Sequence, residues 1–236
     1  MHSIEGQVRK AIEEYDMIKE GDKIAVALSG GKDSVVLLYL LKNLQRYYPK
    51  HFEVTAISIN PGFDGFEERI LKEICEKIKT PLKIEKTDIK QIVFDERKEK
   101  NPCSLCANIR RGALNTVAKE MNCNKIALGH NLDDVLETFL MNLIYTGNIS
   151  TFSPVSYMDR SEITLIRPLI YISEKETKSF IKRNEISIMP KVCPMDGRST
   201  REETLGLLKE LEKYNKHVRA NIFGAIQRST IPGWKK

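Results

Sequence analysis

The residues best suited to chemistry form one short run, Ser29-Gly30-Gly31-Lys32-Asp33-Ser34, between an apolar segment and a helical pattern. A glycine turn between a strand and a helix presents free backbone N–H groups and the positive end of the helix to a bound anion. Its two glycines allow unusual φ values and a close approach to the backbone. Lys32 adds a charge that reaches phosphate oxygens, and Ser29 and Ser34 add hydroxyl donors. The run predicts a nucleotide site.

The run differs from a Walker A loop, which needs a glycine where Val26 stands and a Ser or Thr where Asp33 follows the lysine. Ser-Gly-Gly-x-Asp-Ser after a first strand instead resembles the PP-loop of the ATP pyrophosphatases. The resemblance implies cleavage of ATP between its α and β phosphates and transfer of AMP to an oxygen of the substrate. The alternative is a plain glycine turn capped by Ser or Asp, but an exact six-residue match arises by chance with a probability on the order of 10⁻⁵.

A second group of reactive residues consists of Cys103-Ser104-Leu105-Cys106 and of Cys193, which lies in a loop-like setting. A CxxC pair serves zinc, iron–sulfur or redox chemistry. A tetrahedral structural zinc needs a fourth ligand, and the sequence holds no second CxxC and no pair of histidines at ligand spacing. Three cysteines with one open position suit a [4Fe–4S] cluster that binds something else at its fourth iron, although a reduced, inert or zinc-binding set stays open. Cys75 and Cys123 are expected to be structural.

The third group, Gly129-His130-Asn131-Leu132-Asp133-Asp134, follows an apolar run and opens a helical pattern. Aspartate in a first helical turn is also good capping, and this interpretation stays open for either carboxylate. A Gly-His-Asn turn beside the phosphate loop can contact adenine or ribose, and a carboxylate there can position Mg²⁺ or the attacked group. We therefore expect Gly129 and His130 to bind the nucleotide, together with Ser58 on the second strand. Asp133 and Asp134 are expected to be catalytic, and the sequence does not say which of the two acts.

Strands that alternate with helices must position these groups. Apolar runs typical of strands cover residues 24–28, 54–59, 82–86, 125–128 and 163–166, and helical patterns cover 66–78, 107–121, 132–145, 174–184, 200–214 and 218–227. Residues 149–159 are expected to be a loop. The alternation predicts an α/β fold with a doubly wound parallel sheet, in which ligands bind beyond the carboxyl ends of the strands. Ser29 and Gly129 both lie at such ends.

The composition is that of a globular enzyme with a preference for anions. With 236 residues, 41% of them hydrophobic and 30% charged, we expect an N-terminal helix at 1–20, a catalytic domain at 21–192 and a helical C-terminal extension at 193–236 that carries Cys193. No apolar run approaches the ~20 residues of a membrane span and no targeting segment is visible, so we expect a cytoplasmic protein without a membrane partner. A net charge of +6 favours a polyanionic partner.

Taken in order, these motifs and the segments Arg167-Pro168-Leu169 and Glu174-Lys175-Glu176 make the chain similar to the TtcA family of tRNA 2-thiocytidine synthetases, within the wider TtcA/TtuA thiolation group. The resemblance implies an ATP-dependent tRNA sulfurtransferase with an adenine-nucleotide alpha-hydrolase-like fold. ATP, with Mg²⁺, would adenylate the C2 oxygen of a pyrimidine, expected to be an anticodon-loop cytidine, and sulfur would replace that oxygen. The resemblance also implies a [4Fe–4S] cluster on Cys103, Cys106 and Cys193. The expected partners are tRNA, a sulfur donor such as a cysteine desulfurase or free sulfide, and a second copy in a homodimer.

The two branches of this group differ at positions that the chain allows us to compare. TtuA, which thiolates a uridine, carries cysteine-rich zinc modules at both ends, and this sequence lacks the cysteines to build them. TtuA also has a catalytic lysine four residues after its CxxC, where this chain has Arg110, as TtcA has arginine. The resemblance therefore implies that Arg110 is catalytic beside Lys32. The turn Gly129-His130-Asn131-Leu132 departs from the Gly-His-His-Arg of TtcA, which leaves the modified nucleotide open.

No separate RNA-binding domain is recognisable in the sequence, so the catalytic domain itself would hold tRNA. Trp234 or Phe63 could stack on a base. The basic residues that could neutralise phosphates are Arg110, Arg111, Arg160, Arg167, Arg198, Arg201, Arg219, Arg228, Lys235 and Lys236. Taken alone, each of them is more often a solvated surface residue.

Two other functions stay open at this point. A PP-loop enzyme with another acceptor, as in tRNA lysidine synthesis or small-molecule amidation, would not need Cys103, Cys106 and Cys193. A non-catalytic iron–sulfur or zinc protein that senses nucleotide or redox state would not release pyrophosphate from ATP and tRNA.

Overall fold

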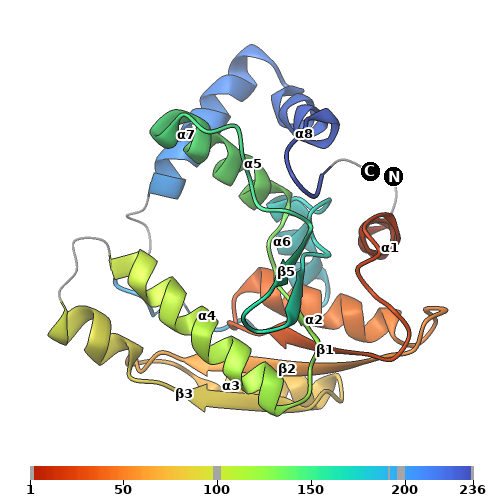
Figure 1. Ribbon diagram of the computed structural model, residues 1–236, viewed down its shortest axis with the longest axis vertical. Coiled ribbons are helices and arrows are strands. Elements are labelled where there is room, and N and C mark those ends of the chain that lie inside the picture. The colour runs from red at the N-terminus through yellow and green to blue at the C-terminus, as the bar shows by residue number, and fades with distance from the viewer. Residues whose placement is uncertain (1–2, 98–101, 191, 196–199, 235–236) are drawn as a thin grey trace.

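A mixed sheet of six strands lies at the centre of the structure, a computed structural model that describes residues 3–97, 102–190, 192–195 and 200–234 (Figure 1). The strands are β1 (Asp22–Ala27), β2 (Phe52–Asn60), β3 (Leu82–Lys86), β4 (Lys125–Ala127), β5 (Val155–Met158) and β6 (Ile163–Ile166). Their order across the sheet is β3-β2-β1-β4-β6-β5. All neighbours are parallel except β5, which pairs with β6 in the antiparallel direction.

The central strands are buried on both faces, which is why they appear in the sequence as nearly continuous apolar runs. On β1, Ile24 and Val26 belong to one core cluster and Ala25 to another, as alternate side chains of a strand must. On β2, Ala56 and Ile57 divide between the two clusters in the same way. The sheet therefore has a hydrophobic core on each face.

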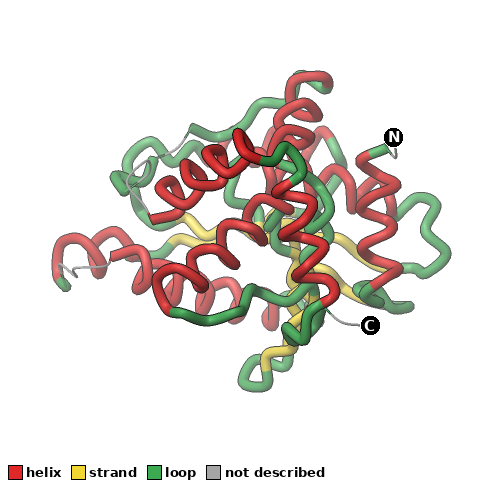
Figure 2. Tube along the Cα trace, turned by 90° about the horizontal axis from the view of Figure 1, so that it is seen from above, coloured by secondary structure: helices red, strands yellow, loops and turns green. Residues whose placement is uncertain are grey.

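Helices cover both faces of the sheet, as expected for a doubly wound fold (Figures 1 and 2). The helix α4 and the π-helical segment η1 contribute to the core on one face, and α1, α2 and α3 contribute to the core on the other. The helices α7 and α8 pack on α5 (Figure 1). The helical elements are α1 (Ile4–Glu14), α2 (Lys32–Leu44), α3 (Glu68–Lys77), η1 (Gln91–Glu96), α4 (Pro102–Glu120), α5 (Leu132–Met141), η2 (Asn142–Thr146), α6 (Glu174–Arg183), α7 (Thr200–Tyr214) and α8 (Val218–Arg228). In the described ranges, no helix is both long and apolar enough to span a membrane.

Three elements differ from the sequence-based expectation. Residues 149–159, expected to be a loop, contain β5, because a four-residue strand at the sheet edge is too short to show a clear alternation. The helix expected from residue 107 begins at Pro102, so Cys103 and Cys106 lie in its first two turns. The pattern at 132–145 is divided between α5 and the π-helical η2.

Trp234, near the C-terminal end of the described chain, is buried in the core and does not face solvent. Its side chain is 1% exposed, and its Nε1 donates to Phe152 O at 3.0 Å. Edge-to-face contacts with Tyr15 and Phe223 complete its surroundings. The prediction that Trp234 stacks on a base is therefore wrong, because burial leaves no ring face for a ligand.

The strand order places a topological switch point between β1 and β4. The chain passes outward from β1 to β2 and β3, and then returns to the other side of β1 with β4. In open α/β sheets, ligands bind in the crevice outside the carboxyl ends of the strands at such a point. The turns after β1 and β4 touch there, since a Cβ on Gly129 would lie 3.0 Å from Ser34 N. The fold thus brings two of the three predicted groups together.

Candidate active site

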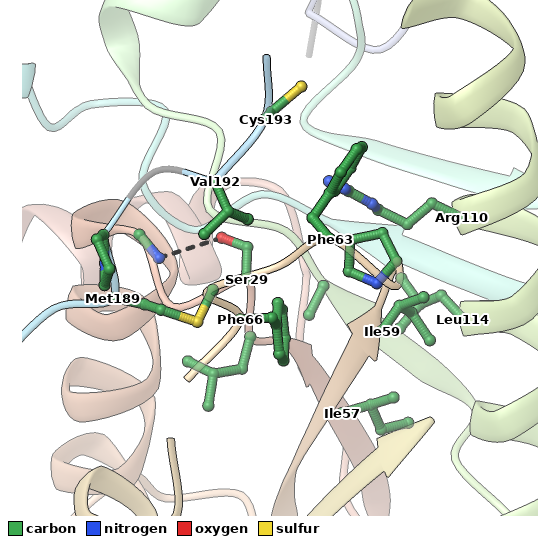
Figure 3. Close-up of a pocket in the computed structure, with 15 residues that line it drawn as sticks. Ser29, Ile57, Ile59, Phe63, Phe66, Arg110, Leu114, Met189, Val192 and Cys193 are labelled. Carbon is green, nitrogen blue, oxygen red and sulfur yellow. Dashed lines mark hydrogen bonds between the residues drawn. The ribbon is translucent and has the colours of Figure 1, made fainter. Parts of the chain in front are cut away.

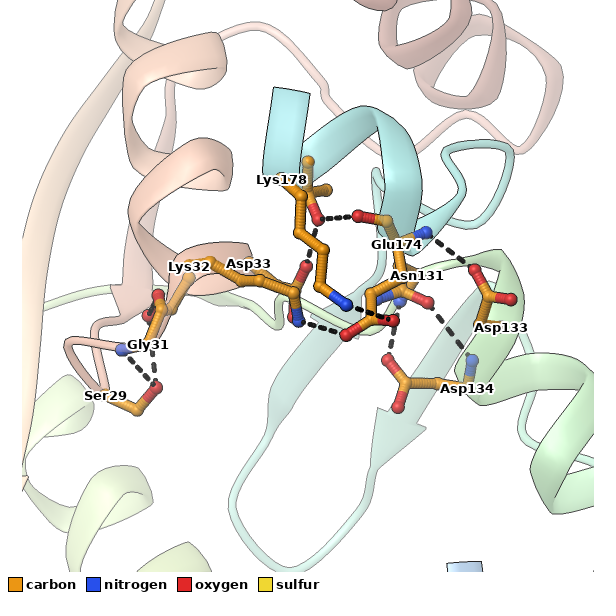
Figure 4. Close-up of polar contacts among 11 residues, drawn as sticks. Ser29, Gly31, Lys32, Asp33, Asn131, Asp133, Asp134, Glu174 and Lys178 are labelled. Atoms are coloured by element: carbon orange, nitrogen blue, oxygen red, sulfur yellow. Dashed lines mark hydrogen bonds and ion pairs between the residues drawn. The ribbon is translucent and has the colours of Figure 1, made fainter. Parts of the chain in front are cut away.

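The turn after β1 has the predicted form of strand, glycine turn and helix (Figure 4). Gly31 is the N-cap of α2 and has no side chain with which to cap it, so N–H groups of the first turn remain for a ligand. Ser34 Oγ donates to Gly31 O at 2.9 Å, and Ser29 Oγ accepts from Gly31 N at 3.4 Å. These bonds hold the turn open toward the crevice as an anion-binding helix end.

Gly30 is the position in this turn where a side chain is least tolerable. It has φ +80°, and a Cβ there would lie 2.6 Å from Met189 Cβ. The N–H of Met189 donates to Gly30 O at 2.9 Å, so the segment after α6 is fixed against the turn.

We expect Gly30→Ala to lower the free energy of unfolding by about 2–4 kcal/mol in urea titrations, because it adds a steric clash to backbone strain. Gly21→Ala is the matched control. Gly21 has φ +77° with open space around it, so strain alone should cost about 1 kcal/mol there. Equal losses in the two variants would show that the contact with Met189 does not constrain the turn.

Lys32 stands between two carboxylates at the start of α2 (Figure 4). Its Nζ lies 2.8 Å from Asp33 Oδ2 and 3.0 Å from Glu174 Oε1, and Thr177 Oγ1 donates to Asp33 Oδ1 at 2.7 Å. Burial lowers the pKa of Lys32, but the bonds to Asp33 and Glu174 outweigh that effect and raise it overall. The ammonium is therefore charged at neutral pH, and α6, which carries Glu174 and Thr177, helps to position it.

Asp133 and Asp134 open α5 and have different partners (Figure 4). Asp134 forms a capping box with Asn131, in which Asp134 Oδ2 accepts from Asn131 N at 2.9 Å and Asn131 Oδ1 accepts from Asp134 N at 3.1 Å. Asp133 Oδ2 accepts from Glu174 N at 2.6 Å, and Oδ1 pairs with Arg219 on α8. Neither carboxylate lines the two cavities described next. These contacts give both residues a positioning role, and their catalytic role stays a prediction.

A first cavity of about 360 Å³ lies beside the turn, on the β2 side of β1 (Figure 3). Ser29, Gly31 and Arg110 form the polar part of its lining, and Cys193 stands at its rim. Most of the lining is apolar and consists of Ala27, Leu28, Ile57, Ile59, Pro61, Phe63, Phe66, Leu114, Met189, Pro190 and Val192. An apolar slot that ends on backbone donors fits a flat aromatic ring joined to phosphate.

A second cavity of about 570 Å³ lies on the β4 and β6 side of the same turn. It shares part of its wall with the first cavity, namely Ala27, Ser29, Gly31, Arg110 and Leu114. Its remaining lining includes Gly129, His130 and Arg167. Two ligands bound in the two cavities would therefore meet at the glycine turn and Arg110.

The three predicted cluster ligands come from one helix and one loop. Cys103 and Cys106 lie one turn apart on α4, and Cys193 lies between α6 and α7. All three are free thiols, with Cys103 and Cys193 exposed and Cys106 half-buried. Burial raises the pKa of Cys106, Arg110 lowers it, and the charges of Cys193 and Cys103 raise it further. Cys103 and Cys193 are thus among the groups whose charges act on Cys106. Within the described ranges, however, no three His, Cys, Asp or Glu side chains converge closely enough to hold a single metal ion.

Not every predicted site residue reaches the crevice. Ser58 is fully buried on β2 and lines neither cavity, and its Oγ has no hydrogen-bond partner in the described residues. Conversely, Glu174 bonds Lys32 and Met189 bonds Gly30, although neither residue is among the predicted site residues. Arg167, expected to be solvated, is buried.

Comparison with known proteins agrees with this arrangement. Residues 1–191 match a family model, ATP_bind_3, described as a PP-loop domain. The tRNA-cytidine(32) 2-sulfurtransferase of Citrifermentans bemidjiense is 38% identical over 226 residues, which cover 94% of this chain and 89% of that protein. The protein of the same name from Geotalea daltonii is 39% identical over 226 residues, covering 94% of this chain and 90% of its own.

Two solved structures extend the comparison. The U34-tRNA thiolase NcsA from Methanococcus maripaludis, solved with its [4Fe-4S] cluster, superposes with a TM-score of 0.76 at 31% identity, over 93% of this chain and 76% of that one. A phosphoadenylyl-sulfate (PAPS) reductase from Candida auris, in a phosphate complex, has a TM-score of 0.51 at 14% identity, over 80% of this chain and 82% of its own. The second likeness shows the fold alone.

Proposed function

The chain belongs to the PP-loop family and, within it, to the tRNA-cytidine(32) 2-sulfurtransferases, and from this membership we propose that it replaces the C2 oxygen of cytidine 32 in tRNA by sulfur. The observation that carries the proposal is the wall shared by two cavities at the glycine turn, with the thiol of Cys193 at the rim of one of them. This arrangement provides one site for ATP, one for the acceptor and one for a carrier of sulfur around a common centre.

ATP would bind with its adenine ring in the first cavity, against the apolar side chains that include Phe63 and Phe66. Its phosphates would lie on the backbone N–H groups of the turn between Ser29 and Ser34. Lys32 would then exchange its bonds to Asp33 and Glu174 for bonds to phosphate oxygens. This exchange needs little rearrangement, because its ammonium already lies at the N-terminus of α2.

In the first step, the C2 oxygen of the base attacks the α-phosphorus of ATP. A new P–O bond forms, the bond to pyrophosphate breaks, and pyrophosphate leaves with the electron pair of that bond. Lys32 and the N–H groups of the turn stabilise the charge that develops there. Arg110, which lines both cavities, is placed to hold the α-phosphoryl group between the two ligands.

In the second step, a sulfide-level sulfur such as hydrosulfide attacks C2 of the adenylated base and a C–S bond forms. The C2–O bond breaks, AMP leaves with the electron pair of that bond, and the proton of the hydrosulfide is lost to solvent, which leaves the thiocarbonyl. Adenylation is needed because it converts a poor oxygen leaving group into AMP. Arg110 would bind the phosphate of AMP as its charge grows.

The donor set fits an iron–sulfur cluster. Cys103, Cys106 and Cys193 are free thiols that are exposed or half-buried, and they would be the ligands. Each cysteine of such a cluster binds a different iron, so the three thiols need not converge on one ion. When bound, a [4Fe–4S] group with three protein ligands supplies an open iron on which sulfur can be presented.

Magnesium belongs to the same proposal. Asp33 and Glu174 are the carboxylates that bond Lys32 at the phosphate turn, and carboxylate oxygens are the ligands that Mg²⁺ prefers. A cation there would replace Lys32 as their partner and free the ammonium for the phosphates. Asp133 would act indirectly, since its bond to Glu174 N fixes the start of α6.

The surface around the second cavity supports a tRNA partner. Arg110 and Arg111 are exposed on α4, and Arg160 is exposed in the turn before β6. Arg219 is engaged with Asp133 and Glu212, so it is less suited to a phosphate. Arg198, the side chain of Arg201, Lys235 and Lys236 lie outside what the structure describes. The sulfur donor, the homodimer and the cytoplasmic location stay predictions.

The experiment that tests the function is sulfur incorporation by anaerobically reconstituted protein with ATP, Mg²⁺, sulfide and a tRNA transcript. Digestion of the product should yield 2-thiocytidine, and a transcript with uridine at position 32 should yield none. An absence of thiolated nucleoside, with iron and sulfide content intact, would remove the proposal. Modification of the same base by an amino acid would instead favour the lysidine-type alternative.

A further inference from the structure

Arg167 follows β6 and is a buried arginine, 7% exposed, that lines the second cavity. Three of its five N–H donors are used within the protein. Its Nε donates to His130 Nδ1 at 3.3 Å, and its Nη1 donates to Ser153 O at 2.6 Å and Ser156 Oγ at 3.1 Å. The guanidinium also packs 5.0 Å from the centroid of the Phe152 ring. These contacts fix its plane and leave both N–H groups of Nη2 without an acceptor in the described residues.

Among the described residues, Arg167 has no ion pair with a carboxylate, and the charged group that acts on its pKa is another arginine, Arg111. Buried charges are normally paired. Burial, and then the charge of Arg111, lower the pKa of Arg167 to about 10, so it remains protonated at neutral pH. Arg110 and Arg111 line the same cavity, and its acidic lining residue, Asp33, is already bonded to Lys32. The cavity therefore favours an anionic ligand.

The rest of the lining narrows the class of ligand. Leu114, Leu128, Met158 and Leu165 give the cavity an apolar surface suited to a flat ring. Asn115 lines it as well, and its Oδ1 is buried without a hydrogen-bond partner in the described residues. A ligand that satisfies these groups has an anionic group, an apolar face and an N–H donor. A cytidine nucleotide has all three, since its base carries an amino group at C4.

We propose that the second cavity holds the target nucleotide of the RNA, turned out of its stack, with its phosphate on Arg167 Nη2 and the amino group of its base on Asn115 Oδ1. This rests on the proposed function, because it places the acceptor of that reaction. Enzymes that act on a base commonly extrude it into a pocket. From this cavity the base reaches Ser29 and Gly31, which also line the proposed ATP site.

The test compares binding of an anticodon stem-loop RNA at several salt concentrations with binding of ATP and of pyrophosphate. Arg167→Gln should weaken RNA binding by about ten- to a hundred-fold. It should also reduce by about one the magnitude of the slope of the logarithm of the RNA association constant against the logarithm of the salt concentration. The affinities for ATP and pyrophosphate should not change. The contact of Asn115 is uncharged and releases no counterion, so Asn115→Leu should weaken RNA binding without changing its salt dependence. This variant should also bind cytidine-containing RNA with less preference over uridine-containing RNA. Arg46→Gln and Asn43→Leu, both exposed positions, are the matched controls and should leave RNA binding as in the wild type.

An unchanged salt slope in Arg167→Gln overturns the proposal, and so does a loss of ATP or pyrophosphate binding that equals or exceeds the loss for RNA. Because Arg167 also bonds Ser153 and Ser156, Arg167→Lys serves as a second variant that keeps the charge. It should retain the slope but lose affinity, because lysine lacks the paired donors of a guanidinium, and wild-type affinity in this variant counts against the proposal. A wild-type chain that neither binds nor thiolates the stem-loop contradicts the proposed function instead, so the two failures are distinct.

Discussion

Replacing Lys32 by methionine will slow ATP-dependent pyrophosphate release by about a hundred- to a thousand-fold, the usual effect of removing one donor that stabilises developing charge. Methionine keeps an unbranched side chain at the start of α2, so the main loss is the ammonium. Negative charge grows on pyrophosphate as its bond to the α-phosphorus breaks, so the loss should fall mainly on kcat and less on the Kd for ATP. Single-turnover pyrophosphate release with tRNA, next to calorimetric ATP binding, measures the two effects separately.

The matched control for this variant is Lys178→Met. Lys178 Nζ lies 2.9 Å from Glu174 Oε2, so it shares a carboxylate partner with Lys32, but its side chain is 61% exposed on α6. An exposed ion pair contributes little, and pyrophosphate release should stay within a few-fold of the wild type. If both variants lost activity equally, neutralisation of Glu174 would be the important event rather than a charge at the phosphate turn. Iron content should be unchanged in both.

The parts of the site that could be predicted from the sequence are those whose partners are close in the chain. Ser29 to Ser34 form a strand-turn-helix unit by local propensity alone, and the structure has it as predicted. The sequence likewise leaves a capping role open for either aspartate, and the structure gives it to Asp134, whose partner Asn131 is three positions away. Local spacing therefore carries both the phosphate turn and one structural role for a carboxylate.

The parts that could not be predicted depend on contacts between distant segments. Asp133 pairs with Arg219, 86 positions away, and Thr177 bonds Asp33 across 144 positions. Nothing in the local pattern of either segment encodes these contacts, because they follow from the way α6 and α8 pack at the carboxyl ends of the strands. The burial of Arg167 could not be predicted for the same reason. Its position after a short apolar strand could equally be solvated, and only the packing of Phe152 and His130 around it makes it a buried charge.

The cysteines combine both situations. The spacing of Cys103 and Cys106 indicates a ligand pair by itself, whereas the proposal that Cys193 is the third ligand depends on the fold, since it lies between α6 and α7. Met189 fixes the beginning of that path against Gly30 at the phosphate turn. The contact that shapes the nucleotide site therefore also constrains where the chain enters the segment that carries Cys193, at the rim of the first cavity.

Cys193→Ser should abolish thiolation while sparing the first half of the reaction. Loss of one of three protein ligands should lower cluster occupancy, and with it 2-thiocytidine formation, by at least about a hundred-fold, since even groups outside the ligand shell cost 10–100-fold in metal affinity. Pyrophosphate release from ATP and tRNA should stay within a few-fold of the wild type, because the phosphates are held by the turn at the N-terminus of α2. Iron and sulfide content, thiolated nucleoside and pyrophosphate release are measured on the same anaerobic preparations.

Cys123→Ser is the matched control for this prediction, because it makes the same atomic change at a buried thiol in the core beneath α4. It should cost some stability but leave iron content and thiolation per folded molecule unaltered. Full thiolation by a Cys193→Ser protein that has lost its iron would exclude sulfur transfer through the cluster. Pyrophosphate release that falls together with thiolation in Cys193→Ser would show that this thiol helps to build the nucleotide cavity that it borders. The assignment of adenylation to the turn before α2 and of sulfur transfer to the cysteines of α4 would then be wrong.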